Sequence, residues 1–223
     1  MVYFEKSQPA PKSLATEKAK RNGTYRTDEV RKRLSTDFKN KCYICEFRAT
    51  SLRIEHFKPH RNDVDLKFDW NNLFWACEHC NSIKGDKVLY DNILNCTDKS
   101  HDVENKLKFI YLPFPINKAD IQLIDDSDIA RNTQHLLLAV YEGTTDLKQK
   151  ESNNMLFFLF SEFDKFNDFL LGYLKSENDD TKNYYFEKIK IELANSSNFT
   201  AFKRWEIKEN YPKLKTEFEQ YFD

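Results

Sequence analysis

Four of the five cysteines form two Cys-x-x-Cys pairs, Cys42 with Cys45 and Cys77 with Cys80. Tetrahedral zinc binds four thiolates readily, and cytosolic reductants oppose disulfides in a chain without a secretory signal. A thioredoxin-type redox site is the weaker interpretation, because it would leave the second pair unexplained. We therefore predict a closed, structural zinc site, and we expect the remaining cysteine, Cys96, to be a small buried side chain.

Three further polar residues lie within or next to this cysteine frame. Glu55 and His56 are adjacent, and Asn81 directly follows the last cysteine. On a strand, neighbouring side chains point to opposite faces, so at the strand end one could hold a metal while the other faces a substrate. A Glu-His pair alone is usually a surface pair. The amide oxygen of Asn81 could complete a hard-metal site with the Glu55 carboxylate, and oxygen ligands favour Mg²⁺ or Mn²⁺.

The pattern of apolar and turn residues predicts the elements that position these groups. Thr27 is suited to be a helix N-cap, and Val30, Leu34 and Phe38 recur on one face behind it, so a helix should lead into the first cysteine pair. The frame itself then predicts, in order, a strand at 52–57, a polar loop at 58–69, a strand at 73–76 and a brief helix at 81–87.

The rest of the chain is mainly helical by pattern. Three- and four-residue apolar spacing predicts a long core helix at 153–176 and further helices at 183–193, 200–211 and 212–222. Residues 91–127 have no clear pattern, and Pro113 with Pro115 argues against a continuous helix there. The predicted class is α+β, mainly α. The expected division is a helical lead-in at 1–41, a zinc-stapled unit at 42–90 and a helical region at 91–223.

The charge is divided unevenly along the chain. The formal net charge is -1, but residues 1–90 carry 18 Lys and Arg against 12 Asp and Glu, which leaves 17 against 24 for residues 91–223. A basic half favours a polyanionic partner such as nucleic acid, although two ordinary solvated surfaces would give the same numbers. The longest apolar run, at 155–160, is too short to span a bilayer, and we expect a cytoplasmic protein.

Three sequence strings carry a resemblance to a known family. RIEHFKPH, DWNNLFWACEHC and NSIKG together resemble the HNH endonucleases of the ββα-metal class, in the branch whose motif is bracketed by two Cys-x-x-Cys pairs. The resemblance covers residues 42–87. Within that branch, CYICE, IEHFKP, DWNNLF and CEHCNSIKGDK are most similar to PtuB, the nuclease component of Septu-type and retron-associated anti-phage defence systems.

The resemblance implies a role for each polar residue of the motif. His56 would be the general base, and Asn72 would be the middle asparagine that fixes the histidine loop, with Asn71 a turn residue. Asn81 would be a metal ligand where many relatives have histidine, and Glu55 stands where Asp or His is usual. These departures give an HNN variant whose catalytic ion is Mg²⁺ or Mn²⁺, while zinc is purely structural. The products would carry 5′-phosphate and 3′-hydroxyl ends.

Other polar residues near the motif are weaker candidates. Lys58, Lys84 and Lys87 lie beside the predicted site and could touch a nucleic-acid backbone, although lysines on polar loops are usually only solvated. His79 lies between two zinc thiolates and is expected to belong to the zinc knuckle without being a ligand. His60 is expected to be a surface histidine.

The resemblance also implies partners. A defence nuclease of this type would work with a PtuA-like ATPase and, in retron settings, with a reverse transcriptase and its RNA–DNA product. The acidic helical region is our candidate for the ATPase-facing surface. Two non-catalytic alternatives stay open: a zinc-ribbon module that binds nucleic acid, and a zinc-stapled scaffold whose helices bind a partner. Neither the choice of DNA or RNA nor a base preference follows from the residues.

Overall fold

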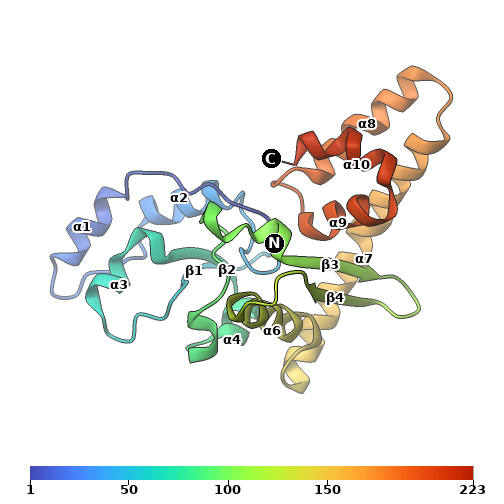
Figure 1. Ribbon diagram of the computed structural model, residues 1–223. Coiled ribbons are helices and arrows are strands. Elements are labelled where there is room, and N and C mark those ends of the chain that lie inside the picture. Colours follow the sequence, from blue (N-terminus) through green and yellow to red (C-terminus); the bar gives the residue numbers. More distant parts are fainter. Residues whose placement is uncertain (223) are drawn as a thin grey trace.

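The computed structural model describes residues 1–222 and has the predicted class, α+β with helices predominant (Figure 1). The α-helices are α1 Lys12–Lys18, α2 Asp28–Asp37, α3 Val64–Phe68, α4 Glu78–Lys84, α5 Val103–Lys106, α6 Asp128–Glu142, α7 Asp146–Lys175, α8 Asp179–Leu193, α9 Thr200–Asn210 and α10 Pro212–Phe218. The strands are β1 Leu52–His56, β2 Leu73–Cys77, β3 Leu107–Leu112 and β4 Lys118–Leu123.

A small ββα unit lies between the cysteine pairs. β1 and β2 pair antiparallel, with Leu52 opposite Cys77 and His56 opposite Leu73. α4 follows β2 directly and packs against both strands. The loop between the strands, predicted to be irregular, contains α3, whose N-cap Asp63 accepts a hydrogen bond from the backbone N–H of Leu66 at 3.0 Å. The unit therefore places the end of β1 beside one face of α4.

The predicted lead-in helix is α2, and it packs on β2. The side chain of Thr27 caps it by accepting a hydrogen bond from Val30 N–H at 3.3 Å, as the sequence indicates. Phe38, at its C-terminal end, lies 5.3 Å from the ring of Phe74 on β2, and Phe4 lies 5.3 Å from Phe38 on the other side. These tilted aromatic contacts join the N-terminal segment to the ββα unit.

Residues 91–127, which have no clear sequence pattern, contain a β-hairpin. β3 and β4 pair antiparallel with Phe109 opposite Ile121, and the buried side chains of β3 alternate along the strand. Pro113 and Pro115 lie in the turn, where a missing N–H costs no ladder bond. α6 covers β4, α9 covers β3, and the main hydrophobic core continues from the ββα unit through this hairpin to α7.

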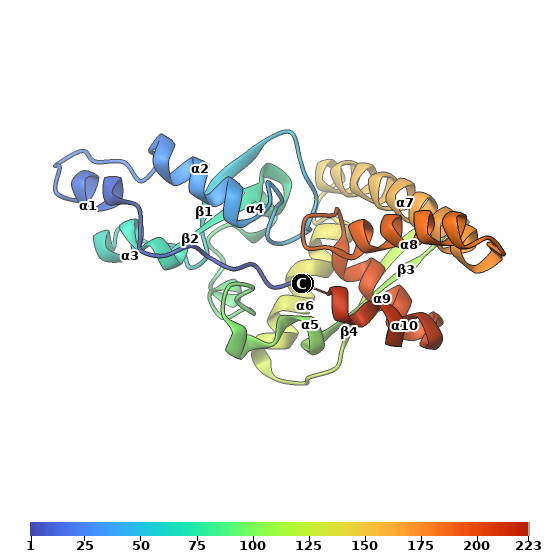
Figure 2. The ribbon, with the colours of Figure 1, turned by 90° about the horizontal axis from the view of Figure 1, so that it is seen from above.

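The C-terminal helices extend from that core. α7 begins at Asp146, seven residues before the predicted start, and α8 returns along it, as the view from above shows (Figure 2). A second, smaller core lies at the far end of α7, where it meets α8, α9 and α10. Its buried members are Phe166, Leu170, Tyr173, Ile189, Leu193, Ile207, Leu214 and Phe218.

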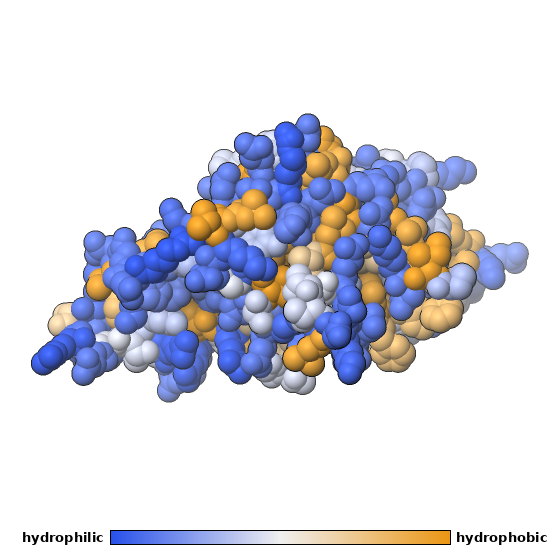
Figure 3. Space-filling model, turned by 90° about the horizontal axis from the view of Figure 1, so that it is seen from below, coloured by the Kyte–Doolittle hydropathy of each residue, from blue (hydrophilic) through white to orange (hydrophobic). Residues whose placement is uncertain are grey.

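Exposed apolar side chains are dispersed over the helical region and the hairpin turn. On the face shown in Figure 3, hydrophilic residues predominate and hydrophobic ones gather in separate patches. The large exposed side chains of α7, α8 and the turn include Phe157, Leu171, Leu174, Tyr184, Ile191, Phe114 and Ile116. Within residues 1–222, no helix combines the length and the apolar character needed to cross a bilayer.

Candidate active site

The four paired cysteines converge in one buried cluster. Their Sγ atoms all lie within 4.8 Å of one another, and the Sγ atoms of Cys45 and Cys77 are 3.9 Å apart. Zinc bound at about 2.3 Å to each of four thiolates would separate the sulfurs by roughly 3.8 Å, so the cluster fits a structural zinc ion. Burial raises the pKa of the Cys45 and Cys80 thiols, and a bound cation is what would keep them as thiolates.

The cluster also starts α4. Cys77 is the last residue of β2 and the N-cap of the helix, and its Sγ accepts a hydrogen bond from Cys80 N–H at 3.4 Å. The helix therefore begins at Glu78, three residues before the predicted start at Asn81. Gly85 ends it with a φ of 53°, a conformation that few other residues adopt. The N-cap and first turn of one short helix thus hold two of the four cysteines, Cys77 and Cys80, and Asn81 follows directly in the same helix.

His56 ends β1 with its imidazole held on one nitrogen. The Nε2 atom lies 3.0 Å from the backbone oxygen of Lys67, and only a protonated nitrogen can donate to a carbonyl. In the neutral ring, Nδ1 is then the proton acceptor. The side chain is only 8% exposed, and the rings of Tyr25 and His60 pack edge-on to it at 4.6 and 4.8 Å between ring centroids. Burial lowers the pKa of His56 below its ordinary value.

Asn72 holds the loop that follows His56. Its Oδ1 accepts a hydrogen bond from Lys58 N–H at 2.8 Å, and its Nδ2 donates to the backbone oxygens of Lys58 at 2.9 Å and Leu66 at 3.1 Å. The neighbouring Asn71 is exposed, and its Oδ1 accepts a bond from Gln8 at 3.1 Å. The geometry therefore favours Asn72 over Asn71 as the residue that fixes the loop.

Glu55 and Asn81 face each other between β1 and α4. One atom of the Asn81 side-chain amide lies 2.5 Å from Oε2 of Glu55. The contact is satisfied when that atom is the nitrogen, which then donates a hydrogen bond to the carboxylate. Rotation of the amide would turn its oxygen toward the carboxylate and offer a divalent cation two oxygen ligands. The pair thus fits a hard metal ion, whose other positions water and phosphate would fill.

A third group, Lys84, completes this arrangement. It is 0% exposed, and its Nζ donates to Oε1 of Glu55 at 2.8 Å and to the backbone oxygen of His56 at 3.0 Å. The predicted contact of Lys84 with a nucleic-acid backbone is therefore wrong, since the ammonium does not reach the surface. Burial raises the pKa of Glu55, and the charge of Lys84 partly offsets that rise.

The remaining predicted residues lie at different distances from this centre. Lys58 and Lys87 are exposed, and Lys87 Nζ also donates to the backbone oxygen of Ile83 at 2.9 Å. His79, on α4, has Nδ1 2.7 Å from Oε2 of Glu151 on α7 and Nε2 2.9 Å from the backbone oxygen of Val140 on α6. It therefore joins the zinc helix to the helical region.

Glu55, Asn81 and His56 line one open pocket of about 310 Å³. Arg61, which sequence reasoning missed, also lines it. Its guanidinium bonds both carboxylate oxygens of Asp91, at 2.6 and 3.0 Å, and the backbone oxygen of Asp86 at 2.9 Å. Its position directly after His60 in the motif could have indicated that Arg61 lies at the site. His60 lines the same pocket and is therefore more than an isolated surface histidine.

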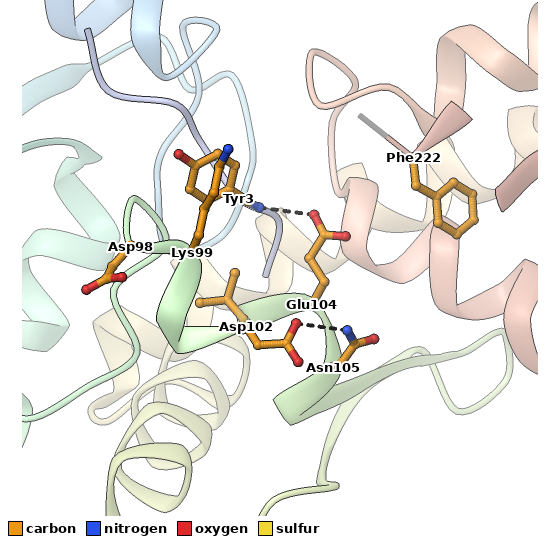
Figure 4. A pocket seen from close by; sticks show the side chains of 8 residues that line it. Tyr3, Asp98, Lys99, Asp102, Glu104, Asn105 and Phe222 are labelled. Atoms are coloured by element: carbon orange, nitrogen blue, oxygen red, sulfur yellow. Dashed lines mark hydrogen bonds between the residues drawn. The ribbon is translucent and has the colours of Figure 1, made fainter. Parts of the chain in front are cut away.

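Another pocket, of about 270 Å³, lies outside the ββα unit and has different chemistry (Figure 4). Its lining includes the carboxylates of Asp98, Asp102 and Glu104. The Glu104 side chain points to the backbone N–H of Tyr3, which donates to it at 3.1 Å. An acidic lining repels phosphate, so this pocket is a poor candidate for binding nucleic acid.

Comparison with known proteins agrees with the geometry of the ββα unit. The family model for HNH endonucleases matches residues 42–87, which span the zinc cluster, His56, Asn72 and Asn81. Residues 42–87 form an HNH endonuclease domain. A search of curated proteins returns no match to the chain. The HNH domain implies a phosphodiester hydrolase that acts on nucleic acid with a divalent metal ion, and the β1–β2–α4 arrangement is its core.

Proposed function

We propose that the protein is a metal-dependent endonuclease in which His56 is the general base and Glu55 and Asn81 hold the catalytic ion. The observation that carries this proposal is the orientation of His56. Its Nε2 is bonded to the Lys67 carbonyl and its ring lines the same pocket as Glu55 and Asn81. A non-catalytic zinc ribbon would not need a histidine held in this way next to a carboxylate and an amide that face each other.

The chain's own residues account for the proton transfer. A neutral His56 can accept a proton at Nδ1 from a water molecule that attacks phosphorus, while the Lys67 carbonyl stabilises the imidazolium that results. Asn72 holds the loop beside His56 by two hydrogen bonds to the backbone of Lys58 and one to the backbone of Leu66. Lys84 orients the Glu55 carboxylate. These contacts fix the base and the metal ligands before the substrate arrives.

Mg²⁺ or Mn²⁺, when bound by Glu55 and Asn81, would supply Lewis-acid stabilisation of the charge that develops on the phosphate and the leaving oxygen. We assign one ion to this pair, because Glu55 from β1 and Asn81 from α4 face each other in the pocket, which Asp86 also lines. The zinc cluster has four protein ligands, all buried, and leaves no position for substrate.

The test is cleavage of plasmid DNA and of structured RNA by the purified chain, with Mg²⁺ or Mn²⁺, alone and with its partner. We expect His56→Ala to lower the rate by about 10²- to 10⁴-fold. Titration of Mn²⁺ into Glu55→Gln, followed by electron paramagnetic resonance, should show weakened binding. Cleavage by His56→Ala at the parent rate would refute the assignment of the base, and undiminished Mn²⁺ binding by Glu55→Gln would refute the metal site.

We further propose that this nuclease acts in anti-phage defence, as the PtuB-like component of a Septu-type or retron-associated system with a PtuA-like ATPase. The support is the similarity of the strings CYICE, IEHFKP, DWNNLF and CEHCNSIKGDK. The ATPase would contact the acidic helical region, where α7 exposes Leu171 and Leu174 one turn apart.

Co-expression with the tagged ATPase tests this surface. Deletion of residues 128–223 would not test the surface, because it would also remove Leu136, Val140 and Phe163, which belong to the core shared with the HNH domain. Leu171→Asp with Leu174→Asp should abolish co-purification. Val88→Asp, a change at a still more exposed apolar position outside the helical region, should leave it intact. Retention of the ATPase by the α7 variant at the parent level would place the contact elsewhere.

A further inference from the structure

A second hollow adjoins the metal site on the other side of Asn81. It has a volume of about 400 Å³, and Asn81 lines both it and the pocket that contains His56. Its rim carries three guanidinium groups, from Arg26, Arg31 and Arg53, and no carboxylate lines it among the residues that the structure describes. The hollow therefore forms a basic approach to the metal-binding pair.

Two of the three arginines come from outside the matched domain. Arg26 precedes the N-cap of α2 and Arg31 lies within that helix, whereas Arg53 lies on β1. The packing of α2 on β2 holds this segment against the domain. The hollow thus exists only because the N-terminal lead-in docks on the ββα unit, which gives residues 1–41 a task beyond covering the core.

The guanidinium groups are available for a new partner. Arg31 pairs with Asp28 at 3.4 Å and Arg53 with Glu78 at 3.1 Å, and both arginines are more than half exposed, at 53% and 59%. Exposed pairs of this kind contribute at most about 1 kcal/mol, so a phosphate can displace them. Arg26 has no carboxylate partner within residues 1–222; its Nε donates to the hydroxyl of Tyr25 at 3.3 Å.

The hollow is connected to the proposed base. The guanidinium of Arg26 lies over the Tyr25 ring, 5.3 Å from its centroid, and the Tyr25 ring packs on His56 at 4.6 Å. A phosphate bound by Arg26 would therefore lie next to the reacting group.

The floor of the hollow indicates which part of a nucleic acid it can contact. Leu52, Ile54 and Trp75 form it, and Trp75 is only 9% exposed. Base stacking needs an accessible ring face, which Trp75 does not offer. An apolar floor with a rim of arginines suits sugar rings and phosphates instead.

We propose that Arg26, Arg31 and Arg53 bind the phosphates of the nucleic-acid strand on one side of the scissile bond, without base recognition. The proposal rests on the nuclease function above and adds the path by which the strand reaches the metal site. It assigns the lead-in helix to substrate binding, with Arg26 holding the phosphate nearest to His56.

Binding can be measured separately from cleavage. The full-length chain with His56→Gln is titrated against fluorescein-labelled 20-mer duplexes of two unrelated sequences, and anisotropy is recorded from 50 to 300 mM salt. Arg26→Gln, Arg31→Gln and Arg53→Gln are added singly and together. Arg131→Gln is the matched control, because Arg131 is also an exposed arginine paired with an aspartate, Asp126 at 3.2 Å, but lies on α6 outside the hollow. Melting temperature and zinc content verify folding.

We expect the triple variant to bind both duplexes at least 10-fold more weakly, and the slope of log affinity against log salt to fall by about 0.9 for each phosphate that the protein no longer neutralises. The control should bind like the parent, and the two sequences should bind equally. Parent-like binding by the triple variant, or no binding by the parent, would overturn the proposal. If the triple variant misfolds, binding by the single Arg53→Gln variant, whose substitution is at an exposed strand position, tests the proposal. Weaker binding would support it, and parent-like binding would overturn it.

The outcome separates this proposal from the nuclease assignment. Loss of binding in the triple variant, together with no cleavage by the chain that carries no substitution, would support phosphate binding in the hollow and refute the nuclease function. Normal cleavage and normal binding by a chain that lacks all three arginines would refute phosphate binding in the hollow and leave the proposed nuclease function standing.

Discussion

The imidazole of His56 donates from Nε2 to the backbone oxygen of Lys67, 3.0 Å away, and this bond fixes which nitrogen can act as a base. Burial lowers the pKa of His56 below its ordinary value of 6.5, and the nearby charges of Lys84 and Arg26 act in the same direction. A base must be neutral, so cleavage should be lost only as the pH falls through this lowered pKa. A cation bound at Glu55 would lower it further.

We therefore predict that the acidic limb of the kcat/KM profile lies below pH 6.5, the ordinary pKa of histidine. The measurement is cleavage between pH 4.5 and 8.5 at saturating Mn²⁺. Zinc content at each pH controls for loss of the fold. An acidic limb above pH 7 would mean that the group being titrated is not His56 in its buried position.

Asn72 should matter for stability and activity, whereas Asn71 should not. Asn72→Ala removes three part-buried hydrogen bonds to the backbone of Lys58 and Leu66, which should cost about 2–3 kcal/mol of unfolding free energy and lower kcat. Asn71→Ala, at an exposed position, should change stability by less than about 0.5 kcal/mol. Urea denaturation of the two variants tests this, and equal effects would contradict the assignment of Asn72 to the loop.

Lys84 should act on the fold and the metal site, without contributing to nucleic-acid affinity. Lys84→Met leaves Glu55 without its ammonium partner, and breaking a buried ion pair in this way typically costs about 3–5 kcal/mol. Lys58→Gln, on the surface, should instead weaken nucleic-acid binding at low salt and leave stability unchanged. Denaturation and anisotropy distinguish the two lysines. A weaker salt dependence of nucleic-acid affinity in Lys84→Met would mean that Lys84 contacts phosphate, contrary to its burial.

Zinc removal should unfold the HNH domain. Cys77→Ser removes one thiolate of the four-sulfur cluster, while the serine hydroxyl can still cap α4, so we expect the bound zinc to fall from one equivalent to near zero, with loss of cleavage and a lower melting temperature. Cys96→Ser is the matched control, because Cys96 is buried but lies outside the cluster. It should retain its zinc. Mass spectrometry of the metal content provides the measurement.

The HNH motif was predictable because its residue types and spacing define its chemistry. Four cysteines, a strand ending in His56 and an asparagine after the last thiolate are sufficient to predict β1, β2 and the zinc cluster. The start of α4 was missed, because its cap is the sulfur of Cys77 and not one of the usual hydroxyl or amide side chains.

Tertiary contacts decided what the sequence did not show. The hairpin of β3 and β4 alternates buried and partly exposed residues, but the prolines in its turn masked that period. Lys84 resembled a solvated lysine because nothing local indicates that α4 brings it under Glu55. The hollow that contains Arg26 and Arg31 depends on the docking of α2 on the ββα unit. This docking cannot be predicted from either segment alone.

His79 gives the short helix α4 a mechanical link to the rest of the molecule. Through Glu151 and the Val140 carbonyl it is attached to both α6 and α7, and Asn81 lies two residues further on. A partner that bends or rotates those long helices would pull on α4 directly. The helical region is thus mechanically coupled to α4 through His79, so a force applied to α6 or α7 would change the orientation of the Asn81 amide.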